Sequence, residues 1–512
     1  MYATPQGTAQ YFTRLGLSPT SPQGARRLGR TELLVSSVGF GGYRITDKNL
    51  RHREALKKAL AEGCNLIDTS TNYTDGASER LVGEVLAEAM SAGTLQRAEV
   101  VVVTKAGYVQ GANLVLAQAR AAEGVPFAEM VEYRPDCWHC ISPDFLRDQL
   151  DRSLERLRLT CVDVLLLHNP EYFIKAGGDH SDYYERIGQA FEYLETEVER
   201  GRIRAYGISS NTLPDARESA EYTSLETLLS LADALGPENH FQVIQFPFNL
   251  LEPAAAFEPN NSGKTLLELA SARDMGTLIN RPLNAFAPTK TDPNRMIRLT
   301  EFKNAYTQTR GLDPLTEATG ALKEAFLDAL RNESAYPGRK WGPAKPLAWG
   351  HLLRENFAKL SDLDLWRQVW TYQLQPEAEK ALTALESRLR AEEQADEQTE
   401  LGHQLRDWIP AYRKSSQALH RAFTDLLEVQ ASEVTDRIRG ILLESVPGLA
   451  TSATLSRKAL RVYRSVPGLH CTLLGMRTPA YVADGLGGKE ADLSPKEALR
   501  ALQATVEGME GG

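Results

Sequence analysis

The stretch VDVLLLH, from Val162 to His168, decides the fold of this chain. Its near-continuous apolarity is what a strand buried on both faces needs, as in a parallel sheet. Six other runs share that character and alternate with longer helical patterns. They are VSSVGFGG near Val38, NLIDTS near Ile67, VVVVTK ending at Lys105, IRAYGISS ending at Ser210, FQVIQFPF around Gln245 and GTLINRPL ending at Leu283. Repeated strand–helix units of this kind predict either a doubly wound sheet or an eight-stranded barrel.

Helix boundaries between these runs are marked by characteristic residues. Ser142-Pro143-Asp144 predicts a helix start, with an N-cap hydroxyl, a first-turn proline and an acid at the positive end of the helix dipole. Glycines that follow a helical pattern and precede a strand predict C-terminal caps. These glycines are Gly63, Gly201, Gly236 and Gly276.

A long interruption separates the seventh apolar run from the eighth. Residues 291–453 show almost only helical periodicity, after which a helix-like run (TLSRKALRVYRS) and an eighth strand-like run (PGLHCTLLGMR) follow. Eight strands in this order favour the barrel over the open sheet. We therefore predict an α/β fold, a (β/α)8 TIM barrel with a large all-helical insertion between strand 7 and helix 7. The expected parts are an N-terminal extension (1–26), a first barrel segment (27–290), the insertion (291–453), a last barrel segment (454–490) and a C-terminal tail (491–512).

Composition restricts the partners and the compartment. The 512 residues carry 58 Lys and Arg against 67 Asp and Glu, a formal net charge of −9. This acidic balance offers no overall attraction for nucleic acid or for anionic lipid, so neither is an expected partner. Five cysteines spread over the chain make no disulfide framework and suit a reducing compartment. Because the N-terminal residues lack a secretory pattern and no run of 18 apolar residues occurs, we expect a cytoplasmic protein.

Chemistry-bearing side chains follow the predicted strands, at the end where barrel enzymes place their active sites. Asp68 and Tyr73 lie in and after the second run, Lys105 ends the third and His168 ends the fourth. Hydride transfer to a carbonyl leaves an alkoxide that needs a proton, and a tyrosine with a pKa of about 10 is a weak donor at neutral pH. A lysine beside it favours the phenolate and lowers that pKa. An aspartate keeps the lysine charged, and a neutral histidine can hydrogen-bond the carbonyl oxygen.

This ordered set resembles the aldo-keto reductase family. The resemblance covers roughly residues 27–283 and 454–486, and GASERLVGEVL, starting at Gly76, adds to it. It implies that Tyr73 is the general acid, with Lys105 as its modulator. Asp68 would then be the partner of the lysine, and His168 would orient the substrate. Without the resemblance, a buried ion pair and a satisfied core histidine explain the same residues.

The resemblance also implies a nicotinamide cofactor extended across the barrel, with NADP(H) expected in preference to NAD(H). No G-x-G-x-x-G fingerprint follows a strand, so a Rossmann mode is not indicated. Ser210 replaces the usual asparagine, Asn280 stands where an aromatic residue is common, and Arg477 is suited to a 2′-phosphate, although a surface arginine also explains it. The expected cofactor-binding residues are Gly42, Tyr43, Ser209, Ser210, Gln245, Asn280, Arg281, Leu283, Gly475 and Arg477.

The motif Cys137-Trp138-His139-Cys140 invites a metal interpretation. A single C-x-x-C without a second pair of ligands is weak, since structural zinc takes four ligands, and we expect no metal. The motif lies in a long loop between the third strand and its helix, on the active face of the predicted barrel. Trp138 and His139 are therefore candidate walls of the substrate pocket.

We expect an NAD(P)-dependent oxidoreductase that interconverts aldehydes or ketones, including sugars, with the matching alcohols. One alternative is an NAD-dependent sugar dehydrogenase of the same fold, favoured by the missing adenosine-phosphate contacts, since Tyr481 and Gly485 stand where the family has polar residues. Another is a nicotinamide-binding regulatory or scaffold protein, since fold does not guarantee turnover. Because strand–helix loops emerge on the active face, residues 291–453 are expected to form a lid over the site or a platform for a protein partner or self-association.

Overall fold

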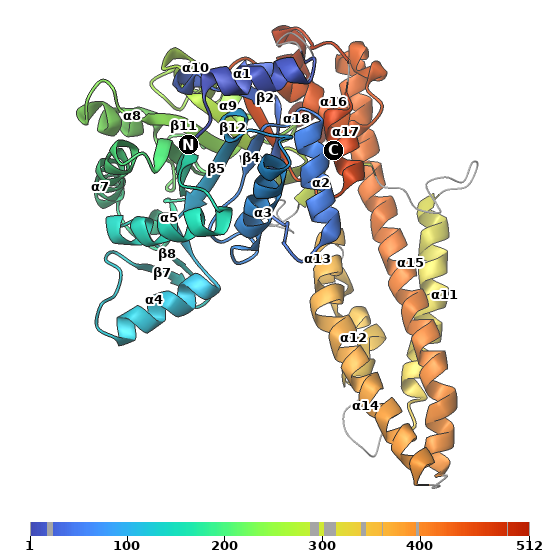
Figure 1. Cartoon of the computed structure of the whole chain (residues 1–512). Coiled ribbons are helices and arrows are strands. Elements are labelled where there is room, and N and C mark those ends of the chain that lie inside the picture. The colour runs from blue at the N-terminus through green and yellow to red at the C-terminus, as the bar shows by residue number, and fades with distance from the viewer. Residues whose placement is uncertain are drawn as a thin grey trace. The chain divides into compact units, whose positions relative to one another are not determined.

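The computed structural model describes residues 2–17, 24–286, 296–301, 314–338, 345–360, 362–395, 399–488 and 490–510 (Figure 1). Eight parallel strands close into a barrel in the order β10-β11-β12-β15-β3-β4-β5-β9. The barrel strands are β3 (Val38–Gly41), β4 (Leu66–Asp68), β5 (Val101–Ala106), β9 (Val162–His168), β10 (Ile203–Ser209), β11 (Phe241–Pro247), β12 (Gly276–Asn280) and β15 (Cys471–Leu474). The eight apolar runs thus become the eight strands, and the predicted barrel is confirmed.

Helices follow the strands and cover the outside of the barrel (Figure 1). They are α2 (Leu50–Ala61), α3 (Ala77–Ser91), α5 (Pro143–Leu157), α7 (His180–Glu199), α8 (Leu225–Ala234), α10 (Leu266–Ala272), α16 (Leu455–Arg464) and α17 (Pro479–Leu486). Helix α5 begins at the predicted proline and buries Phe145, Leu146 and Leu150. The Ser142 hydroxyl donates to the Asp144 carboxylate at 2.7 Å, so Ser142 occupies the N-cap position without capping a backbone N–H through its side chain.

The end of the barrel formed by the amino ends of the strands is closed by the N-terminal part of the chain. Strands β1 (Ala25–Arg27) and β2 (Leu34–Ser36) pair antiparallel, after helix α1 (Pro5–Arg14). Leu28, Leu33 and Val35 join the inward side chains of the barrel strands in one apolar cluster. Fully burying a side chain of this size contributes about 1.5–3 kcal/mol. The barrel interior is therefore a packed core and not a channel.

The loop after β5 carries additional structure. It contains β6 (Tyr108–Val109), α4 (Ala112–Ala122), β7 (Val131–Arg134) and β8 (Cys137–His139). These three strands form an antiparallel sheet in the order β6-β8-β7. The Cys-Trp-His-Cys motif, expected in an extended loop, thus includes the central strand of a small sheet.

A second compact unit spans residues 286–440, and residues 1–285 and 441–512 form the barrel unit. Elements of the second unit include β14 (Met296–Arg298), α11 (Pro314–Ser334), α12 (Trp349–Asn356), α13 (Leu363–Val369) and α14 (Gln375–Gln394), while α15 (Glu400–Ser445) crosses the boundary. Trp349, Trp366 and Phe423 are central to the apolar core of this unit. The chain therefore leaves the barrel after β12 and returns at α16, as the order of motifs predicts.

Two further features concern the ends of the chain and its apolar helices. Residues 491–512, which the sequence analysis treats as a tail, include a helix, α18 (Pro495–Glu510), whose Ala498, Ala501 and Leu502 are buried. The segment expected to be an N-terminal extension likewise includes helix α1, with Tyr11 and Phe12 buried.

Within the described parts of the chain, no helix has both the length and the apolarity needed to cross a membrane.

Candidate functional site

The polar residues of the site lie at the carboxyl ends of the barrel strands, an end called the barrel mouth below. Side chains alternate along a strand, so residues two apart share a face. Val101 and Val103 belong to the apolar cluster inside the barrel, and this alternation places Lys105 on the same inward face. The same rule places Asp68 above Leu66, His168 above Leu166 and Gln245 above Val243. The strands thus bring four separated polar residues to one layer.

Lys105 is the centre of this layer. Its Nζ donates to the Asp68 carboxylate at 2.7 Å, to the Thr69 carbonyl oxygen at 2.8 Å and to the Tyr73 hydroxyl oxygen at 3.2 Å. An ammonium has three N–H donors, so all three are used. Because the Tyr73 oxygen accepts from the lysine, its own O–H stays available to a substrate. Lys105 is fully buried, whereas Tyr73 keeps part of its surface exposed.

Asp68 is held from two sides. The Gln245 amide donates to its carboxylate at 2.9 Å, and the Ser209 hydroxyl donates to the Gln245 carbonyl oxygen at 2.9 Å. Ser209 pairs in register with Gln245 across β10 and β11. Ser209, Gln245, Asp68, Lys105 and Tyr73 therefore form one hydrogen-bonded network. Ser209 and Gln245, which are among the expected cofactor-binding residues, thus also support the Asp68–Lys105 ion pair.

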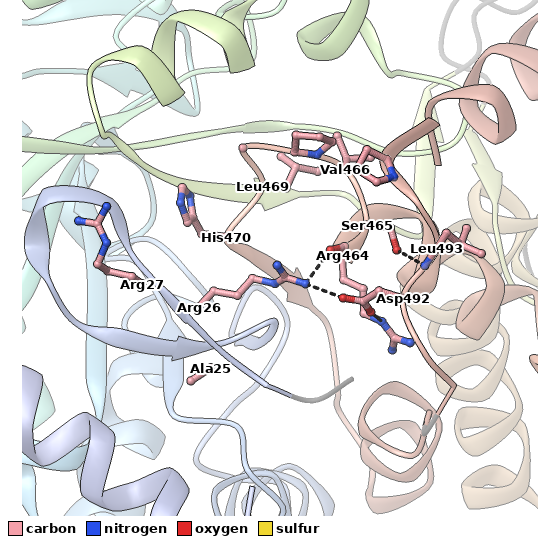
Figure 2. A pocket seen from close by; sticks show the side chains of 13 residues that line it. Ala25, Arg26, Arg27, Arg464, Ser465, Val466, Leu469, His470, Asp492 and Leu493 are labelled. Atoms are coloured by element: carbon pink, nitrogen blue, oxygen red, sulfur yellow. Dashed lines mark hydrogen bonds and ion pairs between the residues drawn. The ribbon is translucent and has the colours of Figure 1, made fainter. Parts of the chain in front are cut away.

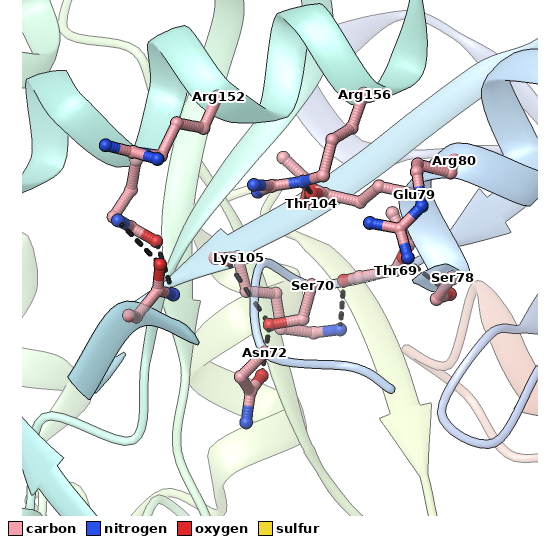
Figure 3. Close-up of polar contacts among 12 residues, drawn as sticks. Thr69, Ser70, Asn72, Ser78, Glu79, Arg80, Thr104, Lys105, Arg152 and Arg156 are labelled. Atoms are coloured by element: carbon pink, nitrogen blue, oxygen red, sulfur yellow. Dashed lines mark hydrogen bonds and ion pairs between the residues drawn. The ribbon is translucent and has the colours of Figure 1, made fainter. Parts of the chain in front are cut away.

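A second buried network lies next to Lys105, around Glu79 and Thr104 (Figure 3). Glu79 of α3 accepts from the Thr104 hydroxyl at 2.6 Å and from Arg156 Nε of α5 at 2.6 Å. Its carboxylate is fully buried, so these contacts compensate the loss of water. They fix helices α3 and α5 to β5 at the residue preceding Lys105.

Burial controls the titration of the site. It raises the pKa of the Asp68 carboxyl and lowers the pKa of the Lys105 ammonium, and each of these charges opposes the shift of the other. Burial also raises the pKa of the Tyr73 hydroxyl well above its ordinary value, with Asp68 and Tyr43 acting in the same direction. From the sequence, we expect Lys105 to lower the pKa of Tyr73. The shift is upward because the desolvation cost of a phenolate dominates, so Tyr73 keeps its proton at neutral pH.

His168 is held as a neutral ring. Burial lowers the pKa of His168 well below its ordinary value, and the nearby Lys105 and His139 add to that shift. Its Nδ1 lies 3.1 Å from the Ser70 hydroxyl oxygen, and its ring lies edge-on to Tyr73 with centroids 5.9 Å apart. Burial thus favours the neutral form of the His168 ring beside Tyr73.

The remaining predicted cofactor residues lie around the same mouth. Ser210 follows the end of β10, and Asn280 ends β12, with its Oδ1 buried and without a hydrogen-bond partner in the described structure. Arg281 has a positive φ of 53° and forms an ion pair with Glu252 at 3.1 Å. The others lie after their strands: Gly42 and Tyr43 after β3, Leu283 after β12, and Gly475 and Arg477 after β15. A Cβ on Gly475 would meet nothing within 4 Å, so backbone at this position is open to a ligand.

Aromatic rings cover His168 on one side. Tyr108 lies edge-on to His168 with ring centroids 4.7 Å apart, and Tyr172 lies 5.0 Å from Tyr108. His139 is buried, and its Nε2 donates to the His168 carbonyl oxygen at 2.8 Å. Trp138 is half-buried on the opposite face of the short strand β8. Of the two candidate pocket walls, His139 thus contacts the end of strand β9 directly.

Glu171 is an additional buried acid close to the predicted cofactor residues. It accepts from the Asn211 backbone N–H at 2.9 Å through Oε1, while Oε2 is buried without a hydrogen-bond partner in the described structure. Burial raises the pKa of Glu171 to about 7. It belongs to the HNPE stretch immediately after β9.

Sequence reasoning missed the partners of the central residues. These are Ser70, Asn72, Tyr108, Glu171 and Tyr172. Ser70, Asn72, Glu171 and Tyr172 lie within five residues of Asp68 or His168, and Tyr108 lies three residues after Lys105. Proximity to a strand end was therefore the available signal. No cluster of three or more potential metal ligands occurs in the portion of the chain described here.

A cavity of about 620 Å³ lies at the other end of the barrel (Figure 2). It is lined by residues 25–27, which include strand β1, by residues 464–470 before β15, and by Asp492, Leu493 and Pro495. Arg26 donates to the Arg464 carbonyl oxygen at 2.7 Å and to the Asp492 carboxylate at 3.1 Å. The cavity therefore lies at the amino ends of the strands, whereas Lys105 lies at their carboxyl ends. In barrel enzymes the amino-end face usually serves stability and not catalysis.

Fold and site together define a (β/α)8 barrel with a buried Asp68–Lys105 ion pair in contact with Tyr73 at its mouth. The sequence model described as the aldo/keto reductase family matches residues 37–319, more than half of the 512 residues. The chain belongs to the aldo/keto reductase family, and the resemblance noted from the motifs is confirmed.

Individual relatives are more distant. A 6-dehydroglucose reductase of Novosphingobium aromaticivorans is 27% identical over 200 residues, 37% of this chain and 53% of the relative. An NADH-specific methylglyoxal reductase of Escherichia coli is 25% identical over 210 residues, 39% of this chain and 56% of the relative. The chain spans about half the length of the curated relatives it matches. A crystal structure of an aldo/keto reductase from Klebsiella pneumoniae with NADP and acetate is 18% identical, covers 51% of this chain and 68% of that chain, and has a TM-score of 0.34.

Proposed function

We propose that this protein is an NAD(P)(H)-dependent oxidoreductase that interconverts a carbonyl compound and its alcohol, with Tyr73 as the general acid and base. The observation that carries the proposal is the Lys105 ammonium, which contacts both the Asp68 carboxylate and the Tyr73 hydroxyl at the barrel mouth. Proton transfer by a positioned side chain contributes about 100- to 10,000-fold to a rate. A buried lysine whose three N–H groups all donate hydrogen bonds is suited to positioning Tyr73 for proton transfer.

The residues at the mouth fit a nicotinamide. Asn280 Oδ1 and Glu171 Oε2 are buried acceptors without hydrogen-bond partners in the described structure, and either one could accept an N–H of a carboxamide. Ser210 and Asn211 follow β10 beside Glu171 and would help to hold the amide. When bound, the nicotinamide supplies or accepts the hydride.

The protein residues would manage the proton. In reduction, the Tyr73 O–H donates to the substrate oxygen as negative charge develops there, and the Lys105 N–H stabilises the phenolate left behind. Asp68 holds the ammonium in place, and Gln245 holds Asp68. In oxidation the same groups act in reverse. Burial raises the pKa of Tyr73, so the hydroxyl keeps its proton at neutral pH, and its donation depends on the Lys105 N–H that would stabilise the phenolate.

We propose NADP(H) as the preferred cofactor, since Arg477 follows β15 where a guanidinium could bind a 2′-phosphate. Replacing Arg477 by alanine should then weaken NADPH binding much more than NADH binding. Equal weakening would favour the alternative of an NAD-dependent sugar dehydrogenase. The names of two relatives, a 6-dehydroglucose reductase and an NADH-specific methylglyoxal reductase, support small carbonyl compounds, including sugars, as the substrate class.

We place this activity in the cytoplasm, because the five cysteines are all free and buried, as suits a reducing compartment. We retain the helical unit as a candidate surface for a protein partner or for self-association. Its separate apolar core supports a distinct role, since a unit that folds around its own core can serve a function apart from the barrel.

The test is a cofactor assay with a matched pair of variants. Wild-type protein should consume NADPH in the presence of small aldehydes or sugars. Tyr73→Phe should lower kcat by at least about 100-fold and leave NADPH binding unchanged, because only the proton donor is lost. Tyr372→Phe, which removes a hydroxyl from an exposed tyrosine of the helical unit, should behave like wild type. Tight cofactor binding without turnover of any carbonyl would instead favour a regulatory or scaffold protein.

A further inference from the structure

The side chain of Tyr463 joins two loops at the barrel mouth. Its hydroxyl oxygen accepts from the Leu250 backbone N–H at 3.1 Å, and its O–H donates to the Pro282 carbonyl oxygen at 2.9 Å. Since a backbone N–H only donates and a carbonyl only accepts, the direction of both hydrogen bonds is determined. Tyr463 is fully buried, and its ring lies edge-on to Phe248 with centroids 6.0 Å apart. Tyr463 thus connects helix α16 to the loop after β11 and to the loop after β12.

The loop after β12 is held at three consecutive positions. Pro282 lies within residues 280–283, which include three of the predicted cofactor residues. The carbonyl oxygens of residues 280, 281 and 282 each accept a hydrogen bond from a different donor. The donors are the Phe248 N–H to Asn280 at 3.2 Å, Asn249 Nδ2 to Arg281 at 3.3 Å and the Tyr463 hydroxyl to Pro282 at 2.9 Å. The backbone of this loop is therefore fixed by the loop after β11 and by α16.

The orientation of the Asn249 amide is determined by backbone groups. Its Oδ1 accepts from the backbone N–H groups of Leu251 and Glu252, both at 3.0 Å, so the amide oxygen and nitrogen cannot exchange places. Its Nδ2 faces two acceptors, the Arg281 carbonyl oxygen and the Glu252 carboxylate at 2.6 Å. Asn249 is fully buried. Its contact with the loop after β12 is therefore a hydrogen bond that Asn249 donates.

The conformation that these contacts hold is unfavourable for the loop alone. Arg281 has a φ of 53°, in the left-handed region that a residue with a side chain rarely adopts. Such a conformation persists only where surrounding contacts determine it, and ligand sites are common places for it. The preceding residue, Asn280, has its Oδ1 buried and without a hydrogen-bond partner in the described structure. The contacts therefore present this acceptor in a shape that the isolated loop would not keep.

The order of the chain explains why the loop needs such support. After residue 285 the chain leaves the barrel unit, and it returns at residue 441. Pro282 comes just before this interruption, and Tyr463 lies 181 residues further along the chain. The next barrel helix therefore cannot restrain the loop through a short connection. The hydrogen bond from the Tyr463 hydroxyl restrains it through space.

We propose that Tyr463 and Asn249 are positioning residues for the nicotinamide cofactor, and that they hold residues 280–283 in the shape that receives it. The inference rests on the proposed function and adds to it the residues that order the loop before the cofactor binds. A loop that is already ordered loses less conformational freedom on binding, so the cofactor binds more tightly. The Tyr463 hydroxyl contacts backbone groups of the two loops and not Lys105 or Tyr73, so proton transfer should not depend on it.

The test measures NADPH binding by isothermal titration calorimetry in the full-length protein and in two tyrosine variants. Tyr463→Phe keeps the buried ring and loses the hydroxyl, and it should raise the Kd for NADPH by about tenfold. Tyr11→Phe is the matched control, because its buried hydroxyl also donates to a backbone carbonyl oxygen, that of Leu60 at 2.6 Å, but does so from helix α1. Tyr11→Phe should bind NADPH like wild type. An unchanged Kd in Tyr463→Phe, or equal weakening in both variants, would overturn the proposal.

Kinetics give a readout that a loss of stability alone would not move. In Tyr463→Phe the KM for NADPH should rise by about tenfold, whereas kcat and the KM for glycolaldehyde at saturating NADPH should change by less than about twofold. A fall in kcat with an unchanged KM for NADPH would contradict a role in positioning the cofactor.

Hydrogen exchange without cofactor tests the contact itself. Tyr463→Phe should raise exchange in peptides that cover residues 248–252 and 280–285, and Tyr11→Phe should not. If Tyr463→Phe does not fold, Asn249→Ala replaces it, because it removes the hydrogen bond to the Arg281 carbonyl oxygen and should raise the same exchange and the Kd for NADPH. Unchanged exchange and an unchanged Kd in a folded variant contradict the proposal.

The wild-type measurement separates this inference from the proposed function. If wild-type protein binds neither NADPH nor NADH, the proposed function fails and the cofactor role of the loop fails with it. If wild-type protein binds NADPH and Tyr463→Phe binds it equally well, only the positioning role fails.

Discussion

At the scale of single residues, the site is governed by the number of hydrogen-bond donors that each group has available. Lys105 uses all three of its N–H groups on Asp68, Thr69 and Tyr73, so the Tyr73 oxygen accepts from Lys105 and the tyrosine proton is not used in that contact. Glu171 shows the opposite condition, since one of its carboxylate oxygens has no hydrogen-bond partner in the described structure. Lys105 thus has all its hydrogen bonds within the protein, whereas Glu171 has an acceptor without a partner in the described structure. This difference is suited to a site in which a bound ligand supplies the missing hydrogen bond.

Glu171 should make stability depend on pH. Its pKa rises from 4.5 to about 7 on burial, so the folded chain binds this proton more tightly than the unfolded chain. Stability should therefore fall as pH rises from about 4.5 to about 7, by about 3 kcal/mol in total at about 1.4 kcal/mol per pH unit. Glu171→Gln stays neutral and should escape this loss. Urea unfolding between pH 4 and 8 measures the difference.

The control for this prediction is Glu123→Gln at an exposed position. Its stability difference from wild type should stay within about 0.5 kcal/mol at every pH. A difference between Glu171→Gln and wild type that is constant from pH 4 to pH 8 would show that Glu171 does not titrate in this range.

At the scale of elements, the site depends on the close contact of neighbouring strands. A Cβ on Gly207 of β10 would lie 1.8 Å from the Val243 carbonyl oxygen of β11. Ser209 and Gln245 follow these two residues in register, so the contact sets the distance across which they hydrogen-bond. The hydrogen-bonded network around Asp68 thus depends on Gly207, because only glycine allows β10 and β11 to approach so closely.

Gly207→Ala should destabilise the protein by about 3 kcal/mol or more, because backbone and not a flexible side chain occupies the required space. Gly188→Ala is the matched control, since its Cβ would meet only a Leu231 methyl at 3.6 Å within helix α7. That change should stabilise the helix by up to about 1 kcal/mol. Urea midpoints compare the two, and equal stabilities would contradict the close-contact account.

The elements differ in how far the sequence predicted them. Apolar runs and helix-start signals predicted the eight strands and α5, because burial on both faces leaves a continuous pattern. Strands β6, β7 and β8 are too short to show one. Gly276, predicted as a helix cap, begins β12 beside Leu28, while Asp274 adopts the positive φ of 48°. Local sequence patterns therefore predicted the positions of the strands, but they did not predict which residues pack against them.

The same limit applies to the candidate site. Asp68, Tyr73, Lys105 and Gln245 were predictable because each lies at or just beyond a strand end, and strand ends meet at the mouth. The contact of Ser70 with His168 joins residues 98 apart and required coordinates. The upward shift of the Tyr73 pKa also depends on burial, which spacing does not reveal.

At the scale of the whole molecule, the chain consists of two compact units, each with its own core. The helical unit is inserted between β12 and α16, and its chain boundaries near residues 286 and 440 differ from the expected 291 and 453. That this unit covers the barrel mouth or binds a partner stays a prediction.

Trp366→Ala should lower the stability of the helical unit without lowering that of the barrel unit. Trp366 is fully buried, lies 4.8 Å from Phe423 between ring centroids and donates to the Thr424 hydroxyl at 3.0 Å. Its loss should destabilise the helical unit by about 3–5 kcal/mol and raise hydrogen exchange in α14 and α15. Exchange in β5 and β9 should not change. If the unit acts as a lid, KM for the carbonyl should rise as well, and an unchanged KM would contradict that role.

The central claim is hydride transfer at the barrel mouth with Tyr73 as the proton donor. Its most direct test uses NADPH and NADH carrying deuterium at the transferable position of C4, together with an aldehyde such as glycolaldehyde, and mass spectrometry of the alcohol formed. The account predicts one deuterium on the carbinol carbon with wild-type protein, and at least about 100-fold less product with Tyr73→Phe. Alcohol without deuterium, or equal product from Tyr73→Phe, would contradict it.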